Sequence, residues 1–431
     1  MIVRLEAVLD ADSHVPCKVQ IDIDLNARID DGGVGSLVAD ETGRAAEIVV
    51  GDLAEQHPAT IQRSAAPEAL TYIDNALTKE PDISLVPKVS EREDVTMSLV
   101  EEPVDGARGA PDALAASLES LALTAVRAAA LAAANHAGSG DGKAADSAAT
   151  EAMRAVLGET KGLGTVIIGE GEKDNAPMLY NGEQLGDGDG PRFDIAVDPV
   201  ECTDLCAAGL PGSLTTIAFA GDGCLWSPGP GLYQDKLVVG RAARDAIDLR
   251  ESPEDNVKNV AAAFGKPVDE MRVLLLDKPR HVELAARLRD MGVCVIMPSA
   301  GDVAGAMFAL LPGTGIDMLM GVGGTPEGIM AACAVKVIGG GMQTRLAPQK
   351  DEEREAIAAA EISTDEILDA EDLVRGPAIF AACGITGGTM LGAPRFTDGW
   401  VSTQSLIVRP GSYRRIVEST PVPESNSAGG D

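Results

Sequence analysis

Five acidic residues in this chain stand where proteins commonly place chemistry. Each lies in a turn framed by glycine or proline, next to an apolar run or the start of a helix: Asp146, Glu170, Asp198, Glu201 and Glu327. In α/β proteins, functional side chains gather at the ends of strands. Carboxylates that converge on one point repel each other, so a pocket lined by them needs compensating positive charge. Oxygen donors without His or Cys suit Mg²⁺ or Mn²⁺. The pattern therefore favours a divalent-metal site that accepts a phosphorylated substrate.

The densest part of this pattern is the stretch FDIAVDPVECTDL, residues 193–205. An apolar run with one buried-looking acid, Asp194, ends there in two carboxylates and a hydroxyl: Asp198, Glu201 and Thr203. A solvated loop is the ordinary explanation for any single one of these acids. The placement of all five acids at element ends favours a shared site instead.

Composition limits the possible fold and partners. At 431 residues we expect two or three units with sizeable cores, and 45% hydrophobic residues is ordinary for a globular protein. A formal charge of −32 argues against nucleic acid and anionic membranes as partners. No apolar run approaches the roughly 18 residues that cross a bilayer, and the N-terminus lacks a signal layout, so we expect a cytoplasmic protein. The seven cysteines are scattered, which favours reduced thiols over a zinc site.

Three stretches of the chain differ in their sequence pattern. Residues 1–108 alternate short β-type runs with polar turns and predict a small β-rich or α+β accessory unit, with 104–112 as its linker. From 113 apolar residues recur at helical spacing as far as Gly138, and β and α signals then alternate, which indicates layered α/β architecture. The predicted strands are 164–169, 193–198, 214–220, 236–240, 272–277, 293–297 and 316–321, and helices are predicted to begin near Ala144, Glu254, Pro279, Asp302 and Pro326. The tail, 421–431, is expected to be disordered.

Seven motifs, in order, resemble those of one enzyme family. DPVECT is similar to the Asp-Pro-(Ile/Leu)-(Asp/Glu)-Gly-Thr signature of lithium-sensitive, metal-dependent sugar and inositol phosphatases. The full set is GEGEKDNAPMLYNGEQLG, FDIAVDPVECT, GLYQDKLVVG, KPRH, GDVA, GIDMLMGVGGTPEG and ACGITGG. Together they resemble the class II fructose-1,6-bisphosphatases over roughly residues 113–418. The first part of the chain carries no such resemblance.

The resemblance implies roles for individual residues. The metal ligands would be Asp146, Glu170, Asp198, Glu201 and Glu327. Thr203 and Asp174 would orient and deprotonate the attacking water, and Glu327 would also belong to the catalytic group. Substrate would contact Glu201, Cys202, Thr203, Tyr233, Lys278, Pro279, Arg280, Ala300, Gly301, Asp302 and Gly324. Lys and Arg make chemical sense there, because a second phosphate far from the metals needs direct cationic partners.

The resemblance also implies a fold and an activity. The fold would be a layered α/β/α/β/α sugar-phosphatase sandwich, with a metal-binding subdomain at 113–250 and a sugar-phosphate-binding subdomain at 251–420. The activity would be Mg²⁺- or Mn²⁺-dependent, lithium-inhibited hydrolysis of the 1-phosphate of fructose 1,6-bisphosphate, a reaction of gluconeogenesis. The partner would be this small sugar bisphosphate, and the enzyme would be a dimer or tetramer of one chain.

Three departures from the family pattern leave the substrate open. Cys202 replaces the glycine of the signature, Ala300 replaces the first acid of Asp-Gly-Asp, and Gly142 stands where lysine is expected, with Lys143 one position later. If Cys202 needs a positive φ, the substitution costs roughly 1 kcal/mol or more. The alternatives are a phosphatase for sedoheptulose 1,7-bisphosphate or an inositol or cyclitol phosphate, and a sugar-phosphate-binding regulator without turnover.

Several candidate residues also have a purely structural interpretation. Tyr233 can be a packing aromatic, and Lys278 and Arg280 can form a solvated helix start, although basic residues there oppose the helix dipole unless an anion is near. His281 is interpreted as a structural or capping residue rather than a catalytic one. The stretch GVGGTPEG has the wrong spacing for a dinucleotide-binding loop.

Overall fold

The computed structural model describes residues 6–7, 19–20, 95–103, 113–170, 178–410 and 412–422. The chain divides into two compact units, Met1–Glu91 and Arg92–Asp431. In the first unit the described residues form one short antiparallel pair, β1 (Glu6–Ala7) and β2 (Val19–Gln20). Most of residues 1–91 lie outside the described residues, so the accessory domain stays a prediction.

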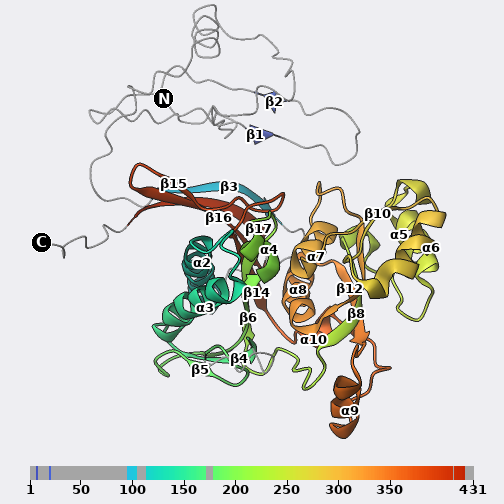
Figure 1. Cartoon of the computed structure of the whole chain (residues 1–431), viewed down its shortest axis with the longest axis horizontal. Helices are drawn as coiled ribbons and strands as arrows, with labels where there is room; N and C mark the ends of the chain where they lie inside the picture. Colours follow the sequence, from blue (N-terminus) through green and yellow to red (C-terminus); the bar gives the residue numbers. More distant parts are fainter. Residues whose placement is uncertain are drawn as a thin grey trace, which may run out of the picture. The chain divides into compact units, whose positions relative to one another are not determined.

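The second unit contains two mixed sheets (Figure 1). The nine-stranded sheet has the order β3-β17-β16-β14-β7-β6-β4-β5, with β15 paired to β16. Its strands are β3 (Val95–Pro103), β4 (Leu163–Ile168), β5 (Gln184–Leu185), β6 (Arg192–Glu201), β7 (Leu214–Gly221), β14 (Ala378–Gly384), β15 (Arg395–Thr397), β16 (Trp400–Arg409) and β17 (Ser412–Pro421). The six-stranded sheet has the order β10-β9-β11-β8-β12-β13. Its strands are β8 (Tyr233–Val239), β9 (Arg272–Leu274), β10 (Cys294–Ile296), β11 (Met318–Gly324), β12 (Gly341–Leu346) and β13 (Leu368–Asp369).

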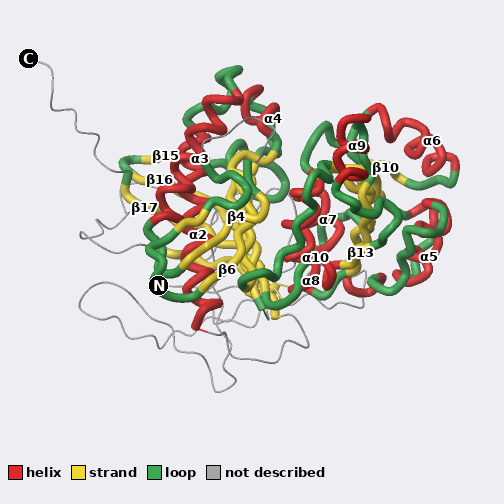
Figure 2. The backbone as a smooth tube through the Cα atoms, turned by 90° about the horizontal axis from the view of Figure 1, so that it is seen from below, coloured by secondary structure: helices red, strands yellow, loops and turns green. Residues whose placement is uncertain are grey.

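Helices separate and cover these sheets. The α-helices are α2 (Ala113–Ala134), α3 (Gly142–Gly158), α4 (Thr203–Ala208), α5 (Pro253–Phe264), α6 (Val282–Asp290), α7 (Asp302–Leu310), α8 (Thr325–Ile338), α9 (Asp351–Ala359) and α10 (Ala370–Leu373). The 3₁₀ turns are η2 (Arg241–Ala243), η3 (Val268–Glu270) and η4 (Pro279–His281). In both views α2 and α3 lie outside the larger sheet, α7 and α8 lie between the sheets, and α5 and α6 lie outside the smaller one (Figures 1 and 2).

Strand alternation produces three separate cores. On β8, Val238 joins the core around α7 and α8, whereas its neighbours Leu237 and Val239 join the core under α5 and α6. On β6, Ala196 faces α8 and Ile195 packs under α2 and α3. Because successive side chains of a strand point to opposite faces, each sheet is buried on both sides. The described second unit is therefore a five-layered α/β/α/β/α structure, which confirms the predicted fold class for that part of the chain.

The predicted elements are found with small shifts of their ends. Each strand predicted between 164 and 321 is present, and helices start within a few residues of the predicted positions. One helix start needs correction, because the residues from Pro279 to His281 form a 3₁₀ turn and α6 begins only at Val282. The six described cysteines are free thiols, as expected: Cys202, Cys206, Cys224, Cys294, Cys333 and Cys383.

The predicted domain limits stay a prediction, and the compact units and the sheets divide the chain at other points. The chain divides after Glu91 rather than near 108, because β3 pairs with β17 and so joins the second unit. A division at 250 does not match the sheets either. The smaller sheet already begins with β8, and β14 to β17 return to the larger sheet. At the C-terminus β17 extends to Pro421, and residues 423–431 lie outside the described residues.

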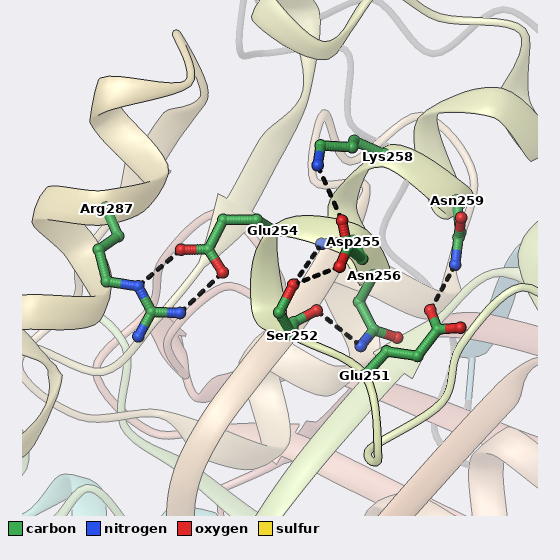
Figure 3. A network of polar contacts seen from close by, with 8 residues as sticks. All are labelled: Glu251, Ser252, Glu254, Asp255, Asn256, Lys258, Asn259 and Arg287. Carbon is green, nitrogen blue, oxygen red and sulfur yellow. Dashed lines mark hydrogen bonds and ion pairs between the residues drawn. The ribbon is translucent and has the colours of Figure 1, made fainter.

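The N-terminus of α5 shows how local polar groups define an element (Figure 3). The Ser252 hydroxyl accepts a hydrogen bond from the Asp255 backbone N–H at 3.1 Å, which caps the helix. Glu254, in the first turn, makes a two-point ion pair with Arg287 of α6 at 2.6 and 2.7 Å. Burial is slight there, and hydrogen bonds from Arg287 hold the pKa of Glu254 below its usual value. This pair fastens α5 to α6 on the outer face of the smaller sheet.

Candidate active site

A β-bulge brings the two acids of DPVE together. Asp198 of β6 pairs with Thr216 of β7, and Glu201 pairs with Leu214, so β6 contains one extra residue between them. In a regular strand, residues three apart point to opposite faces. The extra residue brings the side chains of Asp198 and Glu201 to the same face. Pro199 suits the interruption because it has no N–H to leave unpaired. The Val200 N–H donates to Asp198 Oδ1 at 3.1 Å and fixes the bend.

Glu327 comes to the same point from another layer. It lies in the first turn of α8, and its carboxylate and those of Asp198 and Glu201 offer oxygens within 4.8 Å of one another. Glycine makes room for it, since a Cβ on Gly324 would lie 1.8 Å from Glu327 Oε2. Within the described residues, this buried oxygen has no hydrogen-bond partner.

The remaining two predicted acids act on the same cluster. Burial raises the pKa of Asp198 well above its usual range, and the nearby carboxylates of Glu170, Glu327 and Asp146 raise it further. Burial, followed by Asp198 and Glu327, likewise raises the pKa of Glu201. Like charges gathered in a buried place resist ionisation, so the cluster favours protons or cations. The structure thus brings all five predicted acids into one electrostatic neighbourhood.

The cluster fits a divalent cation. Its donors are carboxylate oxygens, and Glu327 Oε2 is a buried acceptor without a hydrogen bond among the described residues. Hard cations such as Mg²⁺ and Mn²⁺ prefer such donors. The residues therefore suit the predicted metal type, and the donor set does not choose between the two ions.

The turn after β6 leads into α4 through Cys202. This residue has φ +67° and ψ +54°, the left-handed conformation. Thr203 follows as the first residue of α4, and its hydroxyl donates to the Val200 carbonyl at 3.0 Å. Asp174, its predicted partner, lies outside the described residues.

Several predicted substrate residues meet around the end of β11. Tyr233 pairs with Gly324 across β8 and β11, and the Arg280 guanidinium lies 5.5 Å from the centre of the Tyr233 ring. Arg280 also donates to the Val322 carbonyl at 2.8 and 3.0 Å. Lys278 precedes η4 and is half-buried. Arg280 is thus held over Tyr233 although it is exposed.

Asp302, one of the predicted substrate residues, also has a partner within the protein. It is buried and forms an ion pair with Lys236 of β8. Gly301 before it has φ +105°, and a Cβ there would lie 3.7 Å from Cys202 Sγ. The substituted residues 202 and 300 therefore stand on two segments that adjoin in space.

His281 has the structural place expected of it. It is 3% exposed, its Nδ1 lies 2.7 Å from the Leu276 carbonyl, and its Nε2 accepts from the Val322 N–H at 2.9 Å. A carbonyl only accepts, so Nδ1 carries the proton and the ring is neutral. Burial lowers the pKa of His281 accordingly.

Comparison with known proteins agrees with this geometry. The family model for bacterial fructose-1,6-bisphosphatase, glpX-encoded, matches residues 116–420. The chain belongs to this family. It is 39% identical over 293 residues to fructose-1,6-bisphosphatase 1 class 2 of Escherichia coli (strain K12), which covers 65% of this chain and 87% of the relative. The class 2 enzyme of Shigella flexneri matches to the same extent. The resemblance stated from the motifs is confirmed, and residues 1–115 lie outside the family match.

The structure gives a reason for one departure from the fructose-1,6-bisphosphatase pattern. Gly142 is the first residue of α3, and a Cβ on it would lie 2.9 Å from Thr203 Cγ2. A side chain at 142 would therefore crowd the methyl group of Thr203. Lys143 is exposed.

Two buried residues of this fructose-1,6-bisphosphatase family member were missed from the sequence. Lys236 is 1% exposed, and a lysine at the start of the apolar run KLVVG was the signal that could have revealed it. Glu353 of α9 is also buried and accepts from the backbone N–H groups of Leu232 and Tyr233 at 2.7 and 2.9 Å. No local pattern distinguishes Glu353 from its exposed acidic neighbours.

A separate cleft of 860 Å³ contains none of the predicted site residues. It is lined by residues that include Arg272, Phe308, Gln404, Tyr413 and Arg415. Within the described part of this fructose-1,6-bisphosphatase family member, no helix is long and apolar enough to cross a membrane.

Proposed function

We propose that this chain hydrolyses the 1-phosphate of fructose 1,6-bisphosphate to fructose 6-phosphate and phosphate. The observation that carries the proposal is the convergence of Asp198, Glu201 and Glu327 within 4.8 Å, two of them with strongly raised pKa values. Such a cluster is stable when ionised only if cations compensate it. Membership of the fructose-1,6-bisphosphatase family supports this sugar bisphosphate as the substrate.

In the proposed site Asp146, Glu170, Asp198, Glu201 and Glu327 hold Mg²⁺ or Mn²⁺. When bound, these ions neutralise the phosphate and stabilise negative charge on the attacking and leaving oxygens. Thr203 orients water: its proton is donated to the Val200 carbonyl, so its oxygen is left to accept a hydrogen bond. Asp174 takes the water's proton as the water oxygen bonds to phosphorus. The bond from phosphorus to the sugar oxygen breaks, and that oxygen takes a proton from solvent water.

The second phosphate and the sugar are proposed to bind near Tyr233, Lys278 and Arg280. Arg280 presents a planar cation over the Tyr233 ring, and such a group can pair with phosphate oxygens. Asp302, whose carboxylate forms an ion pair with Lys236, stays a predicted substrate residue. The sequence-based expectations of cytoplasmic location and of a dimer or tetramer stay predictions.

A panel of phosphate esters tests the proposal. Phosphate release is measured with Mg²⁺ and with Mn²⁺ on fructose 1,6-bisphosphate, sedoheptulose 1,7-bisphosphate and inositol phosphates. We expect turnover of fructose 1,6-bisphosphate that falls at least about a hundredfold in Asp198→Ala, because several kcal/mol of charge stabilisation are lost. Negligible turnover of this ester beside robust turnover of another would overturn the substrate, and no metal-dependent release from any ester would favour the binding regulator.

A different sugar phosphate is the second candidate, and Cys202 and Ala300 favour it. Their segments adjoin, since Cys202 Sγ lies 3.7 Å from the position of a Cβ on Gly301. Cys202→Gly and Ala300→Asp, alone and together, would restore the family pattern. If the pair of departures defines the substrate, the double variant shifts kcat/KM between esters more than the two single changes combined.

A further inference from the structure

Lys236 places a buried cation beside the acidic cluster. Its side chain lies in β8 and is 1% exposed. The ammonium contacts two groups that belong to different layers, the carboxylate of Asp302 and, at 2.9 Å, the carbonyl oxygen of Gly324. An ammonium offers three donors from one atom, so it can join two segments at a single point.

Each of these two partners leads directly to a predicted metal ligand. Asp302 is the first residue of α7, and the next residue, Val303, donates its backbone N–H to Glu201 Oε1 at 3.1 Å. Gly324 is the last residue of β11, three positions before Glu327 in α8. One ammonium therefore connects the segment that holds Glu201 to the segment that carries Glu327.

The backbone is adapted to this arrangement. A Cβ on Gly323 would lie 1.9 Å from Asp302 Oδ2, so only glycine leaves room for the carboxylate that Lys236 binds. A buried ion pair is seldom more stabilising than apolar residues of the same size. Its presence here is better explained by the geometry that it imposes than by added stability.

We propose that Lys236 is a positioning residue that sets the spacing between Glu201 and Glu327, and through it the affinity of the site for divalent metal. The inference rests on the proposed function, because it requires that these two carboxylates share a metal site. Lys236 touches neither carboxylate in the contacts described, so it acts through Asp302, Val303 and Gly324.

A positioning role and a purely electrostatic role of Lys236 predict opposite changes in metal affinity when its charge is removed. Near a metal site a fixed positive charge repels the incoming cation, so removing that charge should tighten metal binding if electrostatics alone mattered. If Lys236 positions the ligands, its removal weakens binding, because groups that orient metal ligands typically contribute 10–100-fold to affinity. The sign of the change therefore distinguishes the two explanations.

The test is Mn²⁺ binding without substrate, followed by calorimetry and by electron paramagnetic resonance, in Lys236→Met of the full chain. We expect Mn²⁺ binding weakened by at least about tenfold. Lys336→Met is the matched control: Lys336 also contacts a carboxylate and a carbonyl, Glu371 and Val374 O at 2.6 Å, but near the other end of α8. It should bind Mn²⁺ like the wild type. Unchanged or tighter binding in Lys236→Met overturns the proposal.

A second variant covers the case in which Lys236→Met does not fold, since it leaves Asp302 as an unpaired buried charge. Lys236→Arg keeps the charge but spreads its donors over a planar fork. Weaker Mn²⁺ binding in a folded Lys236→Arg supports positioning, and wild-type affinity overturns it. If the wild type binds no Mn²⁺, both the proposed function and this inference fail. If the wild type binds Mn²⁺ and Asp198→Ala does not, the proposed metal site stands, and the Lys236 variants alone decide this inference.

Discussion

Cys202 combines an unfavourable backbone with a position next to two metal-ligand candidates. Its φ of +67° lies in the left-handed region, which costs an L-residue with a Cβ roughly 1–2 kcal/mol. Burial and the surrounding carboxylates of Glu201, Asp198 and Glu327 raise the pKa of its thiol far above the usual value. The side chain is therefore a neutral thiol at a strained turn, and the residue type matters for stability as well as for substrate.

Replacement of Cys202 by glycine is predicted to stabilise the protein. Cys202→Gly removes the steric penalty and should raise the free energy of unfolding by about 0.5–1 kcal/mol, after the extra entropy of glycine in the unfolded chain. Cys202→Ala keeps a Cβ in the left-handed region and should give no such gain. Denaturant titration of the metal-free proteins measures both, and an equal gain in the two variants would contradict the strain argument.

The lowered pKa of His281 predicts that the folded protein loses stability in acid. The folded protein holds this ring neutral with a lowered pKa, while the unfolded chain protonates it at about 6.5. The unfolded state then binds more protons, so the contribution of His281 is present above pH 6.5 and is lost as pH falls below it. The slope is at most about 1.4 kcal/mol per pH unit for one proton.

Urea midpoints between pH 7.5 and 5.5 check this prediction. In His281→Asn the part of the slope that His281 contributes should disappear, because asparagine does not titrate in this range. An identical pH dependence in the variant and the wild type would show that other groups cause the loss.

Among the elements, α9 supports the start of β8 through one carboxylate. Glu353 Oε1 accepts from the N–H groups of Leu232 and Tyr233, and Oε2 accepts from Gln349 at 2.9 Å. The strand that carries Tyr233 and Lys236 is therefore held at its first residue by a helix more than a hundred residues later. Such bonds to a charged acceptor contribute about 1.5–3 kcal/mol each.

Glu353→Gln should destabilise the protein and impair substrate binding. The amide keeps one acceptor oxygen and turns an NH₂ group toward a backbone N–H, which should lower the free energy of unfolding by about 1–3 kcal/mol. Because Tyr233 and Arg280 are proposed to contact substrate, KM should rise more than kcat falls. Glu352→Gln, at an exposed neighbour in α9, is the control. A kcat loss without a change in KM would contradict this role.

For the molecule as a whole, the boundary between the two compact units separates the first 91 residues from the part of the chain that contains the family match. The contacts divide the chain after Glu91, and the family match begins at 116. Between these points lies β3, which pairs with β17 at the edge of the larger sheet. An unpaired β17 would expose its backbone groups to other chains.

Two truncations are predicted to behave differently. Removal of residues 1–91 should leave the melting temperature and the kcat/KM for phosphate release close to those of the full chain. Removal of residues 1–103 also deletes β3, so the melting temperature should fall and association should increase. Calorimetry and light scattering compare the two, and a loss of activity in the shorter truncation would assign the first unit a role in catalysis.

Much of the second unit could be predicted from the sequence. Strand and helix positions follow from local periodicity, and the five acids are recognisable because glycine or proline stands close to each of them, near the ends of the elements. The pairing of the strands could not be predicted, because the partner of a strand lies elsewhere in the chain: β3 with β17 is one case, and the return of β14 to the larger sheet is another.

The sequence by itself determined the order of the elements, the acids at their ends and the family, because each of these is written in short stretches of chain. The tertiary structure alone decided that a bulge turns Asp198 and Glu201 to one side, that Cys202 adopts a left-handed backbone conformation, and that Lys236 forms an ion pair with Asp302. These features depend on pairing register and on charges brought together from distant segments. Such long-range balances of packing and electrostatics have no local signature.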